Sequence, residues 1–147
     1  MFHPELKPTI LVVEDDFALR RLLVLMLRKH GFGTVDTGSA AEALAIARAR
    51  DGRFDLALVD VIMPGVSGLD LAGDLDREYP ELKILYISGF SASVVTDALQ
   101  RRSPERILLK PFDEQTLLSR VHALLTVRRE AASEPFSAPE SRSGTLG

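Results

Sequence analysis

Short hydrophobic runs alternate with amphipathic stretches along most of this chain. The runs are rich in β-branched and aliphatic residues, which predicts strands. The stretches between them place apolar residues at helical spacing, which predicts helices. Strands are expected at residues 9–13, 33–37, 54–59, 83–87 and 106–109. Helices are expected at residues 17–30, 39–50, 69–78, 91–102 and 113–127. This alternation is typical of an α/β fold with a parallel sheet.

The ends and faces of these helices carry signals of their own. Gly31 is expected to end the first helix, since glycine adopts the left-handed cap conformation easily. Ser39 with Glu42 three residues on predicts a capping box, and Asp113 is expected to cap the last helix. On the first helix, the pattern predicts an apolar face of Leu19, Leu22, Leu23, Met26 and Leu27, and a solvent face of Arg20, Arg21, Arg28 and Lys29.

Reactive polar residues follow four of the five expected strands. These residues are Glu14, Asp15 and Asp16 after the first strand, Asp60 after the third, Ser88 after the fourth and Lys110 after the fifth. In an open parallel sheet the carboxyl ends of the strands meet in one crevice. The pattern therefore predicts one pocket with three or four carboxylates, a hydroxyl and an ammonium group, which suits a divalent cation and a phosphoryl group.

Each group in this pocket has a chemical use. Clustered carboxylates repel one another unless a cation or protons intervene, so Glu14, Asp15 and Asp60 are candidate ligands for Mg2+. Lys110 can bind phosphoryl oxygens, and the hydroxyl of Ser88 can donate to another. A carboxylate at such a site can also attack phosphorus, giving an aspartyl-phosphate. Asp16 is expected only to favour the start of the following helix.

Composition and charge remove several other classes of protein. The chain has 147 residues, a formal charge of −3 and no cysteine, which suits one domain without disulfides or thiol chemistry. Basic and acidic residues are interspersed, so neither nucleic acid nor a membrane is an expected partner. His3, His30 and His122 lack metal-ligand spacing. No signal peptide or span of about 20 apolar residues is present, which favours a cytoplasmic location.

Four segments together resemble the receiver domain of bacterial two-component response regulators. They are Val12-Val-Glu-Asp-Asp-Phe17, Leu58-Val-Asp-Val-Ile-Met-Pro-Gly-Val-Ser-Gly68, Ile87-Ser-Gly89 and Leu109-Lys-Pro-Phe112. The resemblance implies a flavodoxin-like (βα)5 fold with strand order 2-1-3-4-5. The expected organisation is an N-terminal extension at residues 1–8, a receiver domain at 9–127 and a tail at 128–147. The small, polar and proline-bearing composition of the tail predicts disorder.

The resemblance also implies a role for each site residue. Asp60 is similar to the phosphoacceptor, Asp15 to the direct Mg2+ ligand, and Glu14 to the acid that reaches the ion through water. Ile62 matches the position whose backbone carbonyl completes the coordination. Ser88 matches the family's switch residue, which carries a hydroxyl group, and Lys110 matches the lysine that is characteristic of the family's site. The Lys110-Pro111 peptide is expected to be cis.

A receiver of this kind is a signalling module, not an enzyme with its own substrate. It takes its phosphoryl group from a histidine kinase or a histidine phosphotransfer protein, and it signals through partner binding or passes the phosphoryl group on. No segment after Val127 is long enough for a DNA-binding output domain, so an unknown downstream protein is expected.

Three departures from the family pattern bear on switching. Ile107 stands where many receivers have an aromatic residue, and residues 100–105 replace a Gly-Ala pair that is usual in the family. These two differences favour a monomer. They also make the chain resemble the receivers of hybrid histidine kinases. Ile62 and Phe90 stand where many relatives have polar residues that orient an attacking water. Slow autodephosphorylation, over hours, is therefore expected.

Two other functions fit the same residues less well. One is a receiver-shaped interaction module that works without phosphorylation. The other is an aspartyl-phosphate phosphohydrolase of the haloacid-dehalogenase type, which normally has a second acid two residues after the nucleophile, where this chain has Ile62. A flavin-binding flavodoxin would need a phosphate loop after the first strand, where this chain has acidic residues instead.

Overall fold

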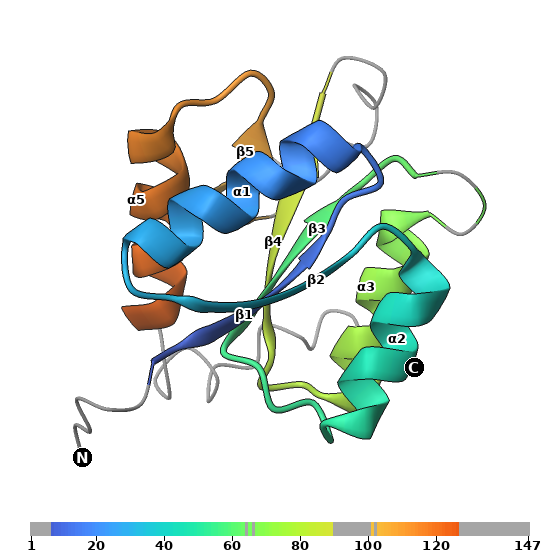
Figure 1. Cartoon of the computed structure of the whole chain (residues 1–147). Helices are drawn as coiled ribbons and strands as arrows, with labels where there is room; N and C mark the ends of the chain where they lie inside the picture. Colours follow the sequence, from blue (N-terminus) through green and yellow to red (C-terminus); the bar gives the residue numbers. More distant parts are fainter. Residues whose placement is uncertain (1–6, 64, 66, 90–100, 102, 127–147) are drawn as a thin grey trace.

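A five-stranded parallel sheet forms the centre of the molecule (Figure 1). The structure, a computed structural model, describes residues 7–63, 65, 67–89, 101 and 103–126. The strands are β1 (Thr9–Val13), β2 (Gly33–Thr37), β3 (Leu56–Asp60), β4 (Lys83–Ser88) and β5 (Ile107–Leu109). Their order is β2-β1-β3-β4-β5, so the predicted fold class and strand order are confirmed.

Helices cover both faces of this sheet. They are α1 (Phe17–Lys29), α2 (Ala40–Ala49), α3 (Gly68–Glu78) and α5 (Glu114–Thr126), with a short 3-10 turn at Pro104–Arg106. Figure 1 shows α1 and α5 on one face and α2 and α3 on the other. The helix predicted at 91–102, Phe90, His3 and the predicted tail at 128–147 fall wholly or largely outside the described residues. None of the helices that the structure describes is both long and apolar enough to cross a membrane.

The two faces of the sheet carry separate hydrophobic cores. On β1, Ile10 and Val12 pack toward α1 and α5, while Leu11 and Val13 pack toward α2 and α3. The central strands β1 and β3 are therefore buried on both sides, which explains why their sequences are continuous apolar runs instead of alternating ones.

The third strand begins and ends later than its hydrophobic run predicts. Just before β3 begins, the side-chain carboxylate of Asp55, and not a backbone carbonyl, accepts the hydrogen bond from the backbone N–H of Thr9 at 2.7 Å. At the other end, Asp60 pairs in register with Ile87. Asp60 is thus the last residue of β3 and not the first residue of the following loop.

The ends of the helices largely follow the predicted caps. Gly31 has φ +90°, and the N–H groups of Gly31 and Phe32 donate to the carbonyls of Arg28 and Leu27, which is a Schellman motif. Asp113 caps α5 by accepting from Thr116 N–H at 2.8 Å.

The capping box predicted at the start of α2 is only half present. Ser39 accepts a hydrogen bond from the backbone N–H of Glu42 at 3.1 Å, as expected. The carboxylate of Glu42 accepts instead from the hydroxyl of Thr37, and that hydroxyl accepts from Ser39 N–H at 3.2 Å. Thr37 intervenes because it ends β2 with a buried hydroxyl that needs both partners.

Two residues of α1 lie differently from their predicted faces. Leu22 was expected to be buried but is 46% exposed, because the packed stripe is centred on Leu23 and Leu27. Arg20 was expected on the solvent face, yet its side chain is only 18% exposed because it turns toward the end of β2.

Candidate functional site

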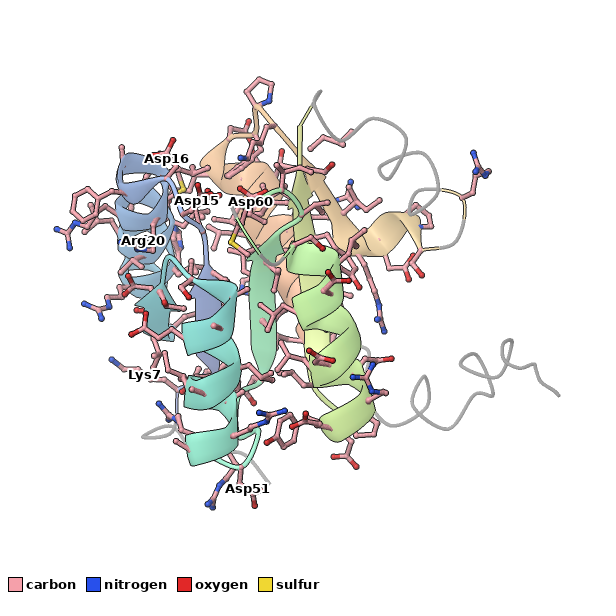
Figure 2. The ribbon with its side chains drawn as sticks, turned by 90° about the vertical axis from the view of Figure 1, so that its right-hand side faces the viewer. Lys7, Asp15, Asp16, Arg20, Asp51 and Asp60 are labelled. Atoms are coloured by element: carbon pink, nitrogen blue, oxygen red, sulfur yellow. The ribbon has the colours of Figure 1, made fainter. Side chains whose placement is uncertain are left out.

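The carboxyl ends of the strands bring the predicted polar residues to one edge of the sheet. Glu14 and Asp15 follow β1, Asp60 ends β3, Ser88 ends β4 and Lys110 follows β5. Figure 2 shows Asp15, Asp16 and Asp60 near the same end of the sheet, far from Lys7, which precedes β1. The parallel topology therefore assembles the site from four separate segments of the chain.

Three carboxylates form a tight cluster at this edge. Glu14, Asp15 and Asp60 each offer an oxygen, and these oxygens all lie within 4.8 Å of one another. Glu14 and Asp60 are 1% and 4% exposed, whereas Asp15 is exposed. Three acids held so close favour a bound cation or proton, because their mutual repulsion is poorly screened in a buried place.

Lys110 supplies the positive charge nearest to this cluster among the described residues. Its Nζ lies 3.2 Å from Oδ2 of Asp60 and 3.7 Å from Oε1 of Glu14. Oδ1 of Asp60 accepts a hydrogen bond from Ile62 N–H at 3.0 Å, which fixes the carboxylate from its other side. The peptide bond from Lys110 to Pro111 is cis, as predicted.

An open cleft of about 810 Å³ gives access to these groups. Besides the polar residues, its wall includes the apolar side chains of Leu19, Leu22, Ile62, Pro111 and Phe112. Leu22 and Ile62 are 46% and 48% exposed. The cleft therefore combines a charged centre with a partly exposed apolar rim.

One carboxylate oxygen of Glu14 is buried without a hydrogen bond from any residue that the structure describes. Oε2 of this residue accepts from Asp16 N–H at 3.1 Å, but its buried Oε1 has no hydrogen bond within the described residues. Burial, followed by the neighbouring Asp60, raises the pKa of Glu14 to about 8, and the hydrogen bond from Asp16 N–H and the charge of Lys110 only partly oppose this rise. Lys110 therefore does not offset the repulsion among the three acids, and a buried acceptor without a hydrogen bond fits a hard divalent cation with oxygen ligands.

The raised pKa predicts how stability depends on pH in metal-free protein. The neutral form of Glu14 is favoured in the folded state, so its stabilising contribution is complete below the ordinary pKa of 4.5 and is lost as pH rises through about 8. We expect Tm of the wild type to fall with rising pH relative to Glu14→Gln, which stays neutral. Thermal unfolding with a chelator measures this, and a Tm difference that is constant with pH would contradict it.

The loop after Asp60 depends on a close approach at Gly68. The N–H of Gly68 donates to the carbonyl of Val61 at 3.1 Å, and Ser67 caps α3 by accepting from Asp70 N–H at 3.1 Å. A Cβ added at Gly68 would lie 1.9 Å from the carbonyl oxygen of Asp60. The first residue of α3 must therefore be glycine for this helix to start so close to the site.

We expect Gly68→Ala to destabilise the protein by at least about 2 kcal/mol, because the methyl group meets rigid backbone. Gly73→Ala is the matched control, since it lies within the same helix and its Cβ would meet only Arg77 Nη1 at 3.9 Å. The control should stabilise by up to about 1 kcal/mol through helix propensity. Urea unfolding compares the two, and equal effects would contradict the close approach.

The structure brings together most of the residues singled out in the sequence. Ser88 is 1% exposed at the end of β4, and its carbonyl accepts from Lys110 N–H at 2.8 Å, which ties the two strand ends together. Asp16 caps α1 by accepting a hydrogen bond from Leu19 N–H at 3.1 Å. It therefore serves the start of the helix, as the sequence predicted. Arg20 was missed, because helical periodicity alone placed it in solvent.

Comparison with known proteins agrees with this geometry. The sequence profile described as "Response regulator receiver domain" matches residues 10–122. The response regulator receiver protein CpdR of Brucella abortus (strain 2308) is 33% identical over 116 residues, which cover 79% of this chain and 95% of CpdR. The sensor kinase CckA of the same organism is 31% identical over 80% of this chain, but the match covers only 12% of that kinase.

A solved structure supports the same assignment. The crystal structure of the receiver domain from the hybrid histidine kinase CckA matches with a TM-score of 0.66 and 31% identity, covering 80% of this chain and 98% of that domain. A profile match over most of the chain, a relative matched over nearly its full length and a shared fold agree with one another. The chain therefore belongs to the family of response regulator receiver domains of two-component signalling.

Proposed function

We propose that Asp60 accepts a phosphoryl group from a phosphohistidine donor in the presence of Mg2+, and that this modification controls binding to a downstream protein. The observation that supports the proposal best is the buried Asp60 carboxylate with Lys110 Nζ at 3.2 Å. It lies in an acidic cluster whose excess charge calls for a cation. We also propose residues 9–127 as the receiver unit.

The divalent cation would be held by Glu14, Asp15, Asp60 and the backbone carbonyl of Ile62. Carboxylate and carbonyl oxygens are the ligands that Mg2+ prefers, and the orphaned Oε1 of Glu14 supplies an acceptor without a hydrogen bond. When bound, Mg2+ would neutralise charge on the carboxylates and on the phosphoryl oxygens.

Transfer to Asp60 is a nucleophilic displacement. A carboxylate oxygen of Asp60 attacks phosphorus, the phosphorus–nitrogen bond of the donor breaks, and the imidazole nitrogen leaves with the electron pair and takes up a proton. Lys110 is placed to move from the Asp60 carboxylate to a phosphoryl oxygen as charge develops there. Ser88 would then donate its hydroxyl to the phosphoryl group and transmit the change to the neighbouring surface.

The donor would be a histidine kinase or a histidine phosphotransfer protein that docks on the apolar rim of the cleft. Leu22 on α1 and Ile62 in the loop after β3 line the cleft that leads to Asp60, and they are 46% and 48% exposed. Phe17, the first residue of α1, is 66% exposed. Exposed aromatic and aliphatic groups beside a charged centre suit a helix that carries a histidine. Relatives of this family include a sensor kinase, which is consistent with such a partner.

Phosphorylation by a small donor tests the proposal. The protein is incubated with phosphoramidate, with Mg2+ or with a chelator, and its intact mass is measured. A gain of one base-labile phosphoryl group that requires Mg2+ is expected. If no adduct forms while calorimetry shows Mg2+ binding, and a phosphorylated kinase also transfers none, the phosphorylation proposal is wrong and the alternative of an unphosphorylated interaction module replaces it.

The phosphorylated protein should lose its phosphoryl group slowly, over hours. Ile62 borders the cleft with an exposed apolar side chain, which cannot orient an attacking water. Ile62→Asn supplies a polar group at the same position and is expected to accelerate the loss of phosphate about ten-fold or more. Release of inorganic phosphate over time measures both rates, and equal rates would contradict the role given to Ile62.

A further inference from the structure

Arg20 links the acidic loop after β1 to the end of β2. Its Nη1 donates to the backbone carbonyl of Glu14 at 2.8 Å, and its Nε donates to Oδ2 of Asp36 at 3.1 Å. Its guanidinium also lies 5.5 Å from the centroid of the Phe17 ring. The side chain is 18% exposed, so these contacts form in a partly desolvated place, where charged hydrogen bonds are stronger than at an open surface. Figure 2 shows Arg20 on α1, near the loop that carries Asp15.

The space for this guanidinium is provided by Gly38. A Cβ at Gly38 would lie 2.4 Å from Nη1 of Arg20 and 3.6 Å from the Cα of Asp15. The guanidinium therefore fits between the acidic loop and the residue after β2 only because Gly38 has no side chain. The N–H of Glu14 donates to the carbonyl of Thr37 at 3.1 Å, so both backbone groups of Glu14 are held by this corner of the molecule.

We propose that Arg20 is a positioning residue for the cation site. By holding the Glu14 carbonyl against Asp36, it fixes the loop so that the carboxylates of Glu14 and Asp15 converge on Asp60. This inference rests on the proposed function, since it assigns Arg20 an effect on the affinity of the site for Mg2+.

Positioning and simple electrostatics predict changes of opposite sign. Removing a positive charge near an anionic site should, by charge alone, make that site bind Mg2+ more tightly. Removing the residue that orients the ligands should make it bind less tightly, since such outer contacts typically change metal affinity by about 10- to 100-fold. The direction of change in Kd therefore separates the two roles.

Four variants of the full chain test the inference by isothermal titration with Mg2+. Arg20→Ala should raise the Kd for Mg2+ about ten-fold. The Kd of Arg20→Lys should lie between those of the wild type and Arg20→Ala, because a single ammonium group cannot contact both the Glu14 carbonyl and Asp36 as the guanidinium does. Gly38→Ala keeps the charge but displaces the guanidinium, and it should raise Kd in the same direction. Arg21→Ala removes an exposed charge from the next position and should stay within about two-fold of the wild type. Circular dichroism confirms that each variant is folded.

Hydrogen exchange on the metal-free protein gives a readout that does not depend on Mg2+. The amides of Glu14 and Asp16, which donate to Thr37 and to the Glu14 carboxylate, should exchange faster in Arg20→Ala, while β1 amides stay protected. An unchanged or lower Kd with unchanged exchange overturns the inference. If the wild type binds no Mg2+, the cation site and the proposed effect on affinity fail together, and exchange alone decides whether Arg20 holds the loop.

Discussion

Asp60→Asn should abolish phosphorylation by phosphoramidate in the presence of Mg2+. The substitution keeps the size and shape of the side chain but replaces the attacking carboxylate with an amide, which is not a nucleophile under these conditions. Asp60 is 4% exposed, and among the described acids its carboxylate lies nearest to Lys110, with Nζ at 3.2 Å. Intact mass after incubation measures the effect, and the variant should show no phosphoryl adduct at times when the wild type is fully converted.

Asp16→Asn is the matched control for this experiment. Asp16 lies beside the cluster but serves α1 as its N-terminal cap, and asparagine caps helices about as well as aspartate. The control should therefore be phosphorylated at nearly the wild-type rate. If Asp60→Asn still gains a phosphoryl group, or if Asp16→Asn is as poorly phosphorylated as Asp60→Asn, the assignment of Asp60 as the acceptor is wrong.

Lys110→Gln should slow phosphorylation by about 100-fold or more, since removing one preorganised donor from a developing oxyanion commonly costs that much in rate. Loss of its positive charge should leave Mg2+ binding as tight as in the wild type or tighter, because fewer cations then oppose the metal. The expected signature is thus a slow reaction at saturating Mg2+. The initial rate of adduct formation, followed at several Mg2+ concentrations, measures both effects.

The control for Lys110 is Lys7→Gln, an identical change at the opposite end of β1. Lys7 is exposed and lies far from Asp60 in Figure 2. The control should react at the wild-type rate. A comparable loss in both variants would show that overall charge is responsible, and a wild-type rate in Lys110→Gln would remove Lys110 from the proposed chemistry.

The sheet and the convergence of the site were predictable because both follow from simple periodicities. Strands buried on both faces, such as β1, have continuous apolar sequences, and the C-terminal ends of parallel strands must meet. The contacts within the site were less predictable. The orphaned Oε1 of Glu14 and its distance from Lys110 depend on side-chain positions that no pattern of residue types specifies.

The errors on α1 have a physical origin. Helical spacing gives the direction of a side chain but not what lies beside it. Leu22 is exposed because it borders the open cleft, and Arg20 is partly buried because the end of β2 offers it Asp36. Asp36 and Gly38 follow Arg20 at a distance of 16 to 18 residues, so their link to Arg20 becomes visible only when β2 is placed beside β1.

The central claim, that Asp60 carries the phosphoryl group, is tested most directly by locating the modified residue. Borohydride reduces an acyl phosphate on aspartate to an alcohol, and this change can be placed on a single residue by peptide mass spectrometry. After phosphorylation with Mg2+, reduction is expected at Asp60 alone. Reduction at Asp15 or Asp16, or a phosphoryl group that borohydride leaves in place on another residue, would contradict the account.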